Sequence, residues 1–210
     1  IYDIAEDKDS ICIIEEFISG KSLTEYVAEH RMLTAAQITD FVLQICEILE
    51  YLHSQGSKGM VHLDLKPDNI LITDTGSVKL IDFDNAVRMG ERHATHYGSI
   101  GFAAPEQYHR LYQDCRADIY SLGMLILYMD NGHVQCHAES LHHKKFYPIV
   151  KKCIHHSIWQ RYRSVKQVRQ AVYSLQAENE LPENIKAQNI SLYGTKHGVG
   201  TTHIALCLTA

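Results

Sequence analysis

A proline inside a short polar stretch is the feature that most constrains what this chain can fold into. The stretch Val61–Ile70 reads V-H-L-D-L-K-P-D-N-I, with Pro67 near its centre. Because proline has no amide hydrogen and a fixed φ, we do not expect a helix to run through the stretch. The residue before a proline is also held in an extended conformation. The sequence therefore predicts a rigid loop, followed by a short buried strand over Ile70–Thr73.

The polar side chains of this loop are of the kinds that phosphoryl transfer uses. Asp64, Lys66 and Asn69 lie close together in it. A carboxylate can orient a hydroxyl nucleophile, an ammonium can neutralise charge on a phosphoryl group, and a carboxamide oxygen is a hard ligand for Mg²⁺. The pattern alone has moderate specificity, because small-molecule phosphotransferases share it. Other segments of the chain are therefore needed to identify the class of phosphotransferase.

The loop resembles the catalytic loop H-R-D-x-x-x-x-N of eukaryotic-type protein kinases, with His62, Asp64 and Asn69 at the matching positions. A lysine two residues after the aspartate, here Lys66, is the serine/threonine-kinase form. The resemblance implies that Asp64 orients the substrate hydroxyl and accepts its proton, and that Lys66 stabilises the transferring phosphoryl group. It also implies that Asn69 is a Mg²⁺ ligand and that His62 is a structural anchor.

The segment Asp82-Phe83-Asp84 matches the D-F-G position of the same family. The resemblance makes Asp82 the second Mg²⁺ ligand. Asp84 replaces the glycine that usually gives this segment its freedom to rotate. Aspartate tolerates unusual dihedral angles better than most residues do. The replacement leaves the predicted metal ligand Asp82 in place, but it removes the glycine on which the usual rotation of this segment depends.

Gly98–Glu106, G-S-I-G-F-A-A-P-E, resembles the end of a kinase activation segment. Ser99 takes the place of the threonine whose hydroxyl bonds the catalytic aspartate and lysine. Asp118 resembles the kinase residue that holds the backbone of the catalytic loop. Arg161 resembles the arginine that pairs with the A-P-E glutamate, here Glu106. The resemblance makes all of these structural anchors.

The N-terminal end predicts a β-hairpin. Two β-rich runs, Ile1–Asp3 and Ser10–Ile18, are separated by the acidic, turn-like Ala5–Asp9. By the resemblance these are the last strands of a kinase N-terminal lobe, most of which is missing, and they lead into a hinge near residues 15–20. The alternative is a plain edge hairpin whose acidic residues face water.

The same resemblance assigns the contacts with ATP. The backbone carbonyl of Glu16 and the N–H of Ile18 would bind the adenine edge, and Leu71 would lie under the adenine ring. Lys66, Asn69 and Asp82 would be the remaining nucleotide-binding residues.

Helical periodicity and capping residues predict the rest of the fold. We expect helices over Leu23–His30, from the cap Thr34 to Gly56, over Arg116–Asn131 and over Ser164–Glu178, and a second short strand over Val78–Ile81. The fold class is α+β and protein-kinase-like, with a mainly helical C-terminal lobe over residues 21–178 of a kinase-like domain 1–178.

The last part of the chain predicts a second, truncated domain. Residues 179–189 are polar, contain Pro182 and form a linker. Residues 190–210 place a short strand, a glycine-rich loop and a helix start in sequence, the context of a phosphate-binding loop in an α/β domain. The loop resembles the deviant Walker A loop of partition-type ATPases through Lys196, but Thr201 replaces the main lysine, which speaks against ATP hydrolysis. A glycine-rich turn that binds nothing is the alternative.

Composition excludes some classes of partner. The formal net charge of −5 argues against a nucleic-acid partner, and no apolar run approaches the length of a membrane span. The six cysteines are single, without a C-x-x-C pair, which indicates a reduced, cytoplasmic protein. The histidines and cysteines of residues 133–156 lack familiar zinc-ligand spacing and indicate a solvated surface. The chain starts at Ile1 and ends in an apolar stretch, so we expect a fragment.

The predicted function is that of a serine/threonine protein kinase that uses ATP and Mg²⁺ on a protein substrate with Ser or Thr. The sequence A-A-P-E-Q-Y over Ala103–Tyr108 and the P-loop-like segment resemble those of bacterial proteins. The glycine-rich loop and the strand lysine with its helix glutamate are not found in these residues, so we expect the fragment alone to be inactive.

Two alternatives remain open. A pseudokinase-like regulator is favoured by Leu63, Asp84 and Thr201, and opposed by the intact polar set of the catalytic loop. A small-molecule phosphotransferase is opposed by the A-P-E element and Arg161.

Leu63 also bears on regulation. It stands where most kinases have an arginine that binds a phosphate on the activation loop, so a phosphate on Thr95 or Ser99 has no cationic partner there. We expect that activity does not wait for phosphorylation of this loop.

Overall fold

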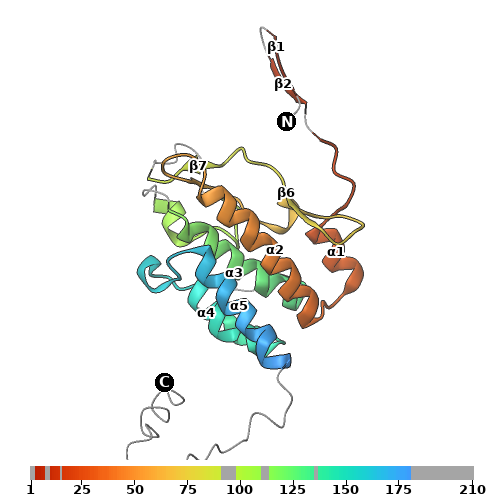
Figure 1. The fold of residues 1–210 in the computed structure, drawn as a ribbon, viewed down its shortest axis with the longest axis vertical. Helices are drawn as coiled ribbons and strands as arrows, with labels where there is room; N and C mark the ends of the chain where they lie inside the picture. The colour runs from red at the N-terminus through yellow and green to blue at the C-terminus, as the bar shows by residue number, and fades with distance from the viewer. Residues whose placement is uncertain are drawn as a thin grey trace, which may run out of the picture. The chain divides into compact units, whose positions relative to one another are not determined.

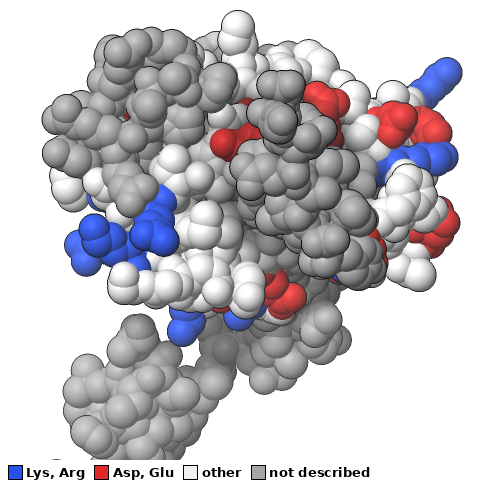
Figure 2. Space-filling model, turned by 90° about the horizontal axis from the view of Figure 1, so that it is seen from above, with Lys and Arg blue, Asp and Glu red and all other residues white. Residues whose placement is uncertain are grey.

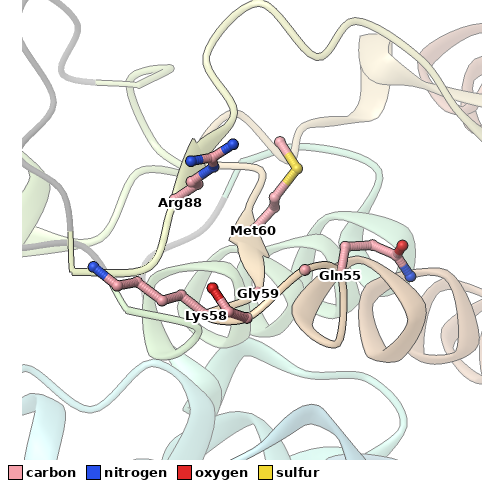
Figure 3. Close-up of a pocket in the computed structure, with 7 residues that line it drawn as sticks. Gln55, Lys58, Gly59, Met60 and Arg88 are labelled. Atoms are coloured by element: carbon pink, nitrogen blue, oxygen red, sulfur yellow. The ribbon is translucent and has the colours of Figure 1, made fainter.

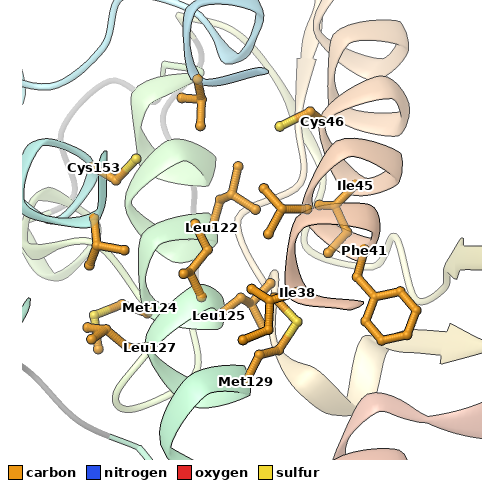
Figure 4. Packing of buried hydrophobic residues seen from close by; sticks show 14 of the residues in the cluster. Ile38, Phe41, Ile45, Cys46, Leu122, Met124, Leu125, Leu127, Met129 and Cys153 are labelled. Atoms are coloured by element: carbon orange, nitrogen blue, oxygen red, sulfur yellow. The ribbon is translucent and has the colours of Figure 1, made fainter. Parts of the chain in front are cut away.

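The computed structural model describes residues 3–7, 10–14, 16–90, 98–109, 114–134 and 137–180. Its centre is a pair of long helices, α2 (Ala35–His53) and α3 (Arg116–Asn131), which pack against each other (Figure 1). On α2, buried residues recur at helical spacing, whereas α3 is buried nearly all round. A helix with no polar face belongs in the middle of a core. Figure 4 shows Ile38 and Ile45 of α2 facing Leu122 and Leu125 of α3.

Three more helices surround this pair. They are α1 (Leu23–His30), α4 (Tyr147–Cys153) and α5 (Val165–Glu180). Both α1 and α2 begin with a capping box, Ser22 with Glu25 and Thr34 with Gln37. These reciprocal bonds satisfy the amide groups that a helix start leaves free.

The predicted helices are present, with small shifts at their ends. The bounds of α1 and α3 are those predicted from the sequence, and α5 runs two residues further than predicted. The second helix ends at His53, before the predicted stop at Gly56, which instead takes a left-handed φ of +64° in the following turn. Helix α4 was not predicted. Its signal is short, an apolar stripe of Ile149, Val150 and Cys153 behind a proline in the first turn.

Short strands connect the helices. In one antiparallel sheet β5 (Ile70–Ile72) lies between β3 (Lys21–Ser22) and β6 (Val78–Leu80), and β4 (Met60–Val61) pairs with β7 (Val87–Arg88) in another. The strands predicted near residues 70 and 78 are present. The two-residue strands were missed, because such short segments show no periodicity and form only where a distant partner supplies the hydrogen bonds.

The hairpin has other bounds than the sequence predicts. Strand β1 (Asp3–Asp7) pairs with β2 (Ser10–Ile14), and the register joins Ala5 to Cys12 and Asp7 to Ser10. Residues 5–7, expected in the turn, thus belong to the first strand, since pairing outweighs their acidic composition. Residues 16–19 have no regular structure, although the prediction extended the second strand to Ile18.

Short 3₁₀ turns complete the chain: η1 (Pro67–Asn69), η2 (Pro105–His109), η3 (Ala138–Ser140), η4 (Lys144–Phe146) and η5 (Ile158–Gln160). Most of the predicted linker and the whole P-loop-like segment lie outside the described residues. Within the described part, no helix has both the length and the apolarity needed to cross a membrane.

Candidate active site

The carboxylate of Asp118 fixes the polar loop in place. Asp118 is fully buried in the first turn of α3. Its Oδ2 accepts the backbone N–H of His62 and its Oδ1 accepts that of Leu63, each at 2.9 Å. Nε2 of His53, in the last turn of α2, lies 2.9 Å from Oδ2. A buried carboxylate needs such partners, and here they tie α2, α3 and the loop together.

Leu63 is held in a strained backbone conformation. Its φ is +65°, which is rare for a residue with a branched side chain. Besides its bond to Asp118, its carbonyl oxygen accepts Nε2 of the buried Gln107 at 2.8 Å. Gln107 is itself oriented by the N–H of Ala104, which donates to its Oε1 at 2.8 Å. The peptide groups on both sides of Leu63 are therefore fixed, as a conformation of this kind requires.

The prediction that no helix runs through the loop needs a small correction. One 3₁₀ turn, η1, begins at Pro67 itself. A proline in the first position of a helical turn is tolerated, because the amide hydrogen that it lacks would have no partner there. Lys66, just before it, is extended with φ −145° and ψ 164°, as expected.

Asp64 gathers three of the predicted site residues around its carboxylate. Oδ2 accepts from Nζ of Lys66 at 2.9 Å and from Nδ2 of Asn69 at 3.2 Å, and Oδ1 accepts from Oγ of Ser99 at 2.7 Å. Nδ2 of Asn69 also donates to the carbonyl oxygen of Asp64 at 2.9 Å. The turn η1 makes this possible by folding Asn69 back towards Asp64.

Both charged groups of this cluster are kept ionised by their surroundings. Burial raises the pKa of Asp64, but the hydrogen bonds from Lys66, Ser99 and Asn69 and the charge of Lys66 together hold the pKa below its usual value. The hydrogen bond to Asp64 raises the pKa of Lys66, against the smaller opposing effect of burial. At neutral pH the cluster is thus a carboxylate paired with an ammonium.

Asn69 and Asp82 offer oxygen donors for a divalent cation. The amide nitrogen of Asn69 is directed to Asp64, which leaves its carboxamide oxygen for a cation. Asp82 is exposed, and the N–H of Ile81 binds the carbonyl oxygen of Asn69 at 2.9 Å, which ties the two segments together. Oxygen donors of these two kinds suit Mg²⁺. Within the described residues, no hydrogen bond joins the two side chains.

The unusual backbone in this segment lies at Asp82, with φ +63°, and not at Asp84. The N–H of Asp84 donates to Oδ1 of Asp82 at 3.3 Å. Because Asp84 does not adopt a positive φ, this conformation makes no use of glycine's freedom at that position.

The predicted anchor pair is formed. Nη1 and Nη2 of Arg161 lie 2.6 and 2.8 Å from the two carboxylate oxygens of Glu106, and both residues are buried. Arg161 also donates to the carbonyl oxygens of His155 and Arg116 and lies over the ring of Tyr120. This bidentate geometry is the strongest that an arginine and a carboxylate can adopt.

His62, also predicted as an anchor, is fully buried. Its Nδ1 accepts the N–H of Asp64 at 3.3 Å, and its ring meets that of Phe83 edge-on at 5.1 Å between centroids. It therefore connects the polar loop with the segment that carries Asp82.

The residues predicted to bind adenine are not gathered at Asp64. Glu16 is exposed and Ile18 half-buried in the irregular segment 16–19. Leu71 is half-buried in the centre of β5, where it pairs with Ser22 and Lys79. Among the described residues, no hydrogen bond links Glu16 or Ile18 to the Asp64 cluster.

A surface pocket of about 330 Å³ is lined by residues outside the Asp64 cluster. The turn after α2 and the strands β4 and β7 line it with Gln55, Gly56, Ser57, Lys58, Gly59, Met60 and Arg88 (Figure 3). None of the predicted site residues lines it, so the candidate chemistry does not depend on this pocket.

Comparison with known families identifies the family to which this chain belongs. The model of the protein kinase domain matches residues 1–192. The chain belongs to the protein kinase family. This match confirms the kinase-like α+β fold predicted from the sequence. The P-loop-like domain over residues 190–210 stays a prediction.

Named relatives of this kinase-family chain include proteins from bacteria and from the mouse. A probable serine/threonine-protein kinase of Clostridium acetobutylicum is 34% identical over 144 residues, 67% of this chain and 22% of that protein. Serine/threonine-protein kinase PrkC of Bacillus subtilis is 31% identical over 67% of this chain and 22% of that protein. Sperm motility kinase 2B of Mus musculus is 32% identical over 67% and 29%. The matched part spans less than a third of each relative.

Two residues of this candidate site were missed by the sequence analysis. Gln107 follows the A-P-E element directly, so its place beside a recognised motif was the available signal. His53 had none, because its role depends on Asp118, which is 65 positions away in the chain.

Proposed function

We propose that this chain is the C-terminal lobe of a serine/threonine protein kinase that transfers the γ-phosphoryl group of ATP to a Ser or Thr hydroxyl of a protein substrate. The observation that carries the proposal is the Asp64 carboxylate, bonded to Lys66, Asn69 and Ser99 on a loop that the buried Asp118 fixes. The Glu106–Arg161 pair supports a protein substrate over a small molecule, because in this family it belongs to the activation segment.

In the proposed reaction the substrate hydroxyl oxygen forms a bond to the γ-phosphorus, and the bond from that phosphorus to the oxygen of ADP breaks. Asp64 orients the hydroxyl and takes up its proton. A carboxylate of lowered pKa is a weak base, which suffices because the transition state is loose and positioning matters more than basicity. Lys66 stabilises the charge on the transferring group.

Asn69 and Asp82 are the residues that would hold Mg²⁺, which when bound neutralises the charge of the phosphates. Glu16, Ile18 and Leu71 are proposed to bind the adenine of ATP. We also propose a cytoplasmic location, from the single cysteines.

The test uses the full-length protein with Mg²⁺ and γ-labelled ATP. Asp64→Asn should lower labelling of Ser or Thr by about 10²- to 10⁴-fold, the contribution typical of a positioned proton acceptor. The matched control is Asp68→Asn, an exposed aspartate of the same turn that has no hydrogen bond to the Asp64 cluster and instead accepts one from the Thr24 hydroxyl. Equal loss in both variants would overturn the role of Asp64. ATP binding without any labelling would favour a pseudokinase-like regulator, which Leu63 and Asp84 also favour.

The proposed kinase should not depend on phosphorylation of its activation segment. Leu63, in the place of the usual phosphate-binding arginine, packs in a small buried cluster with Val61, Ala104 and Ala117. Its side chain is committed to packing and offers no cation. Phosphatase treatment should leave the labelling rate of a fresh substrate unchanged, and complete loss of activity would contradict this proposal.

A further inference from the structure

The charge of this chain is divided very unevenly along the sequence. Between Ser140 and Ala177 lie eight of the 20 Lys and Arg residues and none of the 25 Asp and Glu residues. That segment carries a charge of +8, and the remainder, with 12 cations against 25 acids, carries −13. Figure 2 shows one face of the molecule, on which Lys and Arg side chains lie at the left and at the right edge and most acidic side chains lie from the centre to the right.

Five cations of this segment form what we call the cationic patch, consisting of Lys144, Lys145, Lys151, Lys152 and Arg163. All are exposed except Lys145, which is half-buried. In the described part of the chain, none of the five makes an ion pair with a carboxylate. Arg161 and Arg169 lie in the same segment, but each forms an ion pair with a carboxylate and is therefore not part of the patch.

Contacts between neighbours make the patch continuous. Nζ of Lys151 lies 5.4 Å from the ring centre of Tyr147, and Nζ of Lys152 lies 4.3 Å from that of Tyr162, the neighbour of Arg163. On the other side, Oη of Tyr147 donates to the carboxylate of Glu139, and Nζ of Lys144 donates to the carbonyl oxygen of Glu139. Aromatic rings thus position the ammonium groups of Lys151 and Lys152. Glu139 is an acidic group at the edge of the patch, and its pKa is lowered mainly by a backbone hydrogen bond and also by the charge of Lys151.

The patch stands on a rigid base. Helix α4 turns Ile149, Val150 and Cys153 into the core and leaves Pro148, Lys151 and Lys152 outside. It packs closely on α3, because a Cβ on Gly123 would lie 2.6 Å from Cβ of Cys153. The same helix α3 carries Asp118, which holds the catalytic loop. The patch and Asp64 are therefore attached to one helix.

We propose that the cationic patch docks an acidic, Asp- or Glu-rich segment of a protein partner. The shape of the charge distribution favours a short segment over an extended polyanion. Screening in physiological salt confines attraction to about 8 Å, so a short segment meets only the patch. A long duplex or a membrane would extend beyond the patch, and the chain outside this segment has 12 Lys and Arg residues against 25 Asp and Glu residues. Resting on the proposed function, that partner is the protein substrate, which docking would concentrate near Asp64.

Direct binding tests the patch without relying on catalysis. The anisotropy of a fluorescein-labelled Glu-rich peptide is measured with the full-length protein at rising salt, beside the same peptide with Gln for Glu. Lys151→Gln with Lys152→Gln should weaken binding of the acidic peptide about three- to thirtyfold, as expected for two exposed ion pairs. The control, Lys58→Gln with Lys79→Gln, removes two exposed lysines elsewhere, and should leave affinity unchanged within about twofold.

Three results would overturn the proposal. They are no binding of the Glu-rich peptide at low salt, equal weakening in both double variants, and tighter binding of duplex DNA or phosphatidylserine vesicles through Lys151 and Lys152. The Asp64→Asn variant separates this surface from the proposed function, because it should lose labelling and keep the peptide affinity. If the wild-type protein binds the peptide but labels no substrate, the docking surface stands and the kinase proposal fails.

Discussion

At the scale of single residues, three side chains determine the ionisation state of Asp64. One oxygen of its carboxylate faces the hydroxyl of Ser99, and the other faces Lys66 and Asn69. Each of these bonds has an ionised acceptor, and such bonds are stronger than those between neutral groups. Loss of one donor should therefore be felt both in the chemistry and in the titration of Asp64.

Removing the Ser99 hydroxyl tests the shortest of these bonds. Ser99→Ala should lower phosphoryl transfer by the full-length protein about ten- to hundredfold, because a hydrogen bond to a charged group contributes roughly 1.5–3 kcal/mol. Ser99→Thr keeps the hydroxyl and should retain most of the activity. The measurement is the steady-state labelling rate of the wild type and of the two variants. If Ser99→Thr were as impaired as Ser99→Ala, the hydrogen bond from the residue-99 hydroxyl to Asp64 would not explain the loss.

The lowered pKa of Asp64 predicts a loss of stability in acid. The ordinary value is 3.8, and the folded value lies below it, so the unfolded chain takes up a proton first as the pH falls. The contribution of Asp64 is therefore complete above pH 3.8 and is lost below it, as the pH falls through the folded value. Urea unfolding between about pH 5 and about pH 2.5 should show a steeper fall in unfolding free energy for the wild type than for Asp64→Asn. Parallel curves would contradict the prediction.

At the scale of elements, buried polar side chains join segments that are far apart in the chain. Asp118 connects α2, α3 and the catalytic loop, Gln107 connects η2 to Leu63, and Glu106 connects η2 to Arg161 after η5. Such groups are costly to bury alone and specific when paired. They explain why the loop can hold Leu63 in a left-handed conformation.

Breaking the buried pair from one side should be strongly destabilising. Arg161→Met leaves the carboxylate of Glu106 buried without its partner, and the free energy of unfolding should fall by about 3–5 kcal/mol. Arg163→Met is the matched control, since Arg163 is exposed, and should change it by less than about 0.5 kcal/mol. Chemical denaturation of both variants provides the comparison. Similar small changes would mean that the pair contributes little.

At the scale of the whole molecule, the close contact of α3 with α4 joins the helix that holds the Asp64 loop to the cationic patch. Gly123 permits this contact, because a Cβ there would lie 2.6 Å from Cβ of Cys153 and 2.7 Å from Cγ2 of Ile154. Both of these neighbours are packed in or against the main core, so they have little room to move.

Filling this contact should cost stability despite a better helix former. Gly123→Ala gains about 1 kcal/mol in helix propensity, but overpacking should lower the unfolding free energy by about 1–3 kcal/mol. The net change should be destabilising in thermal or urea unfolding. Ser174→Ala, on the exposed side of α5, changes a helical residue without a clash and should be neutral or slightly stabilising. A stabilised Gly123→Ala variant would show that the helices can separate without cost.

The sequence alone determined the features that depend on neighbours along the chain. Capping boxes fix the starts of α1 and α2, apolar spacing marks α2, α3 and α5, and Pro67 shapes the loop. The order of the motifs was enough to predict the kinase family and to select Asp64, Lys66, Asn69 and Ser99, which the fold then brings together. These signals are local, so folding of the remaining chain was not needed to recognise them.

Only the tertiary structure decided the features that depend on partners far away in the chain. The two-residue strands β3, β4 and β7 exist because distant segments pair with them, and α4 is too short to be marked by periodicity. The left-handed Leu63 requires both Asp118 and Gln107, and the role of His53 requires Asp118. In each case a hydrogen bond or a packing contact across the core outweighs local preference, and no local pattern of residues encodes such a contact.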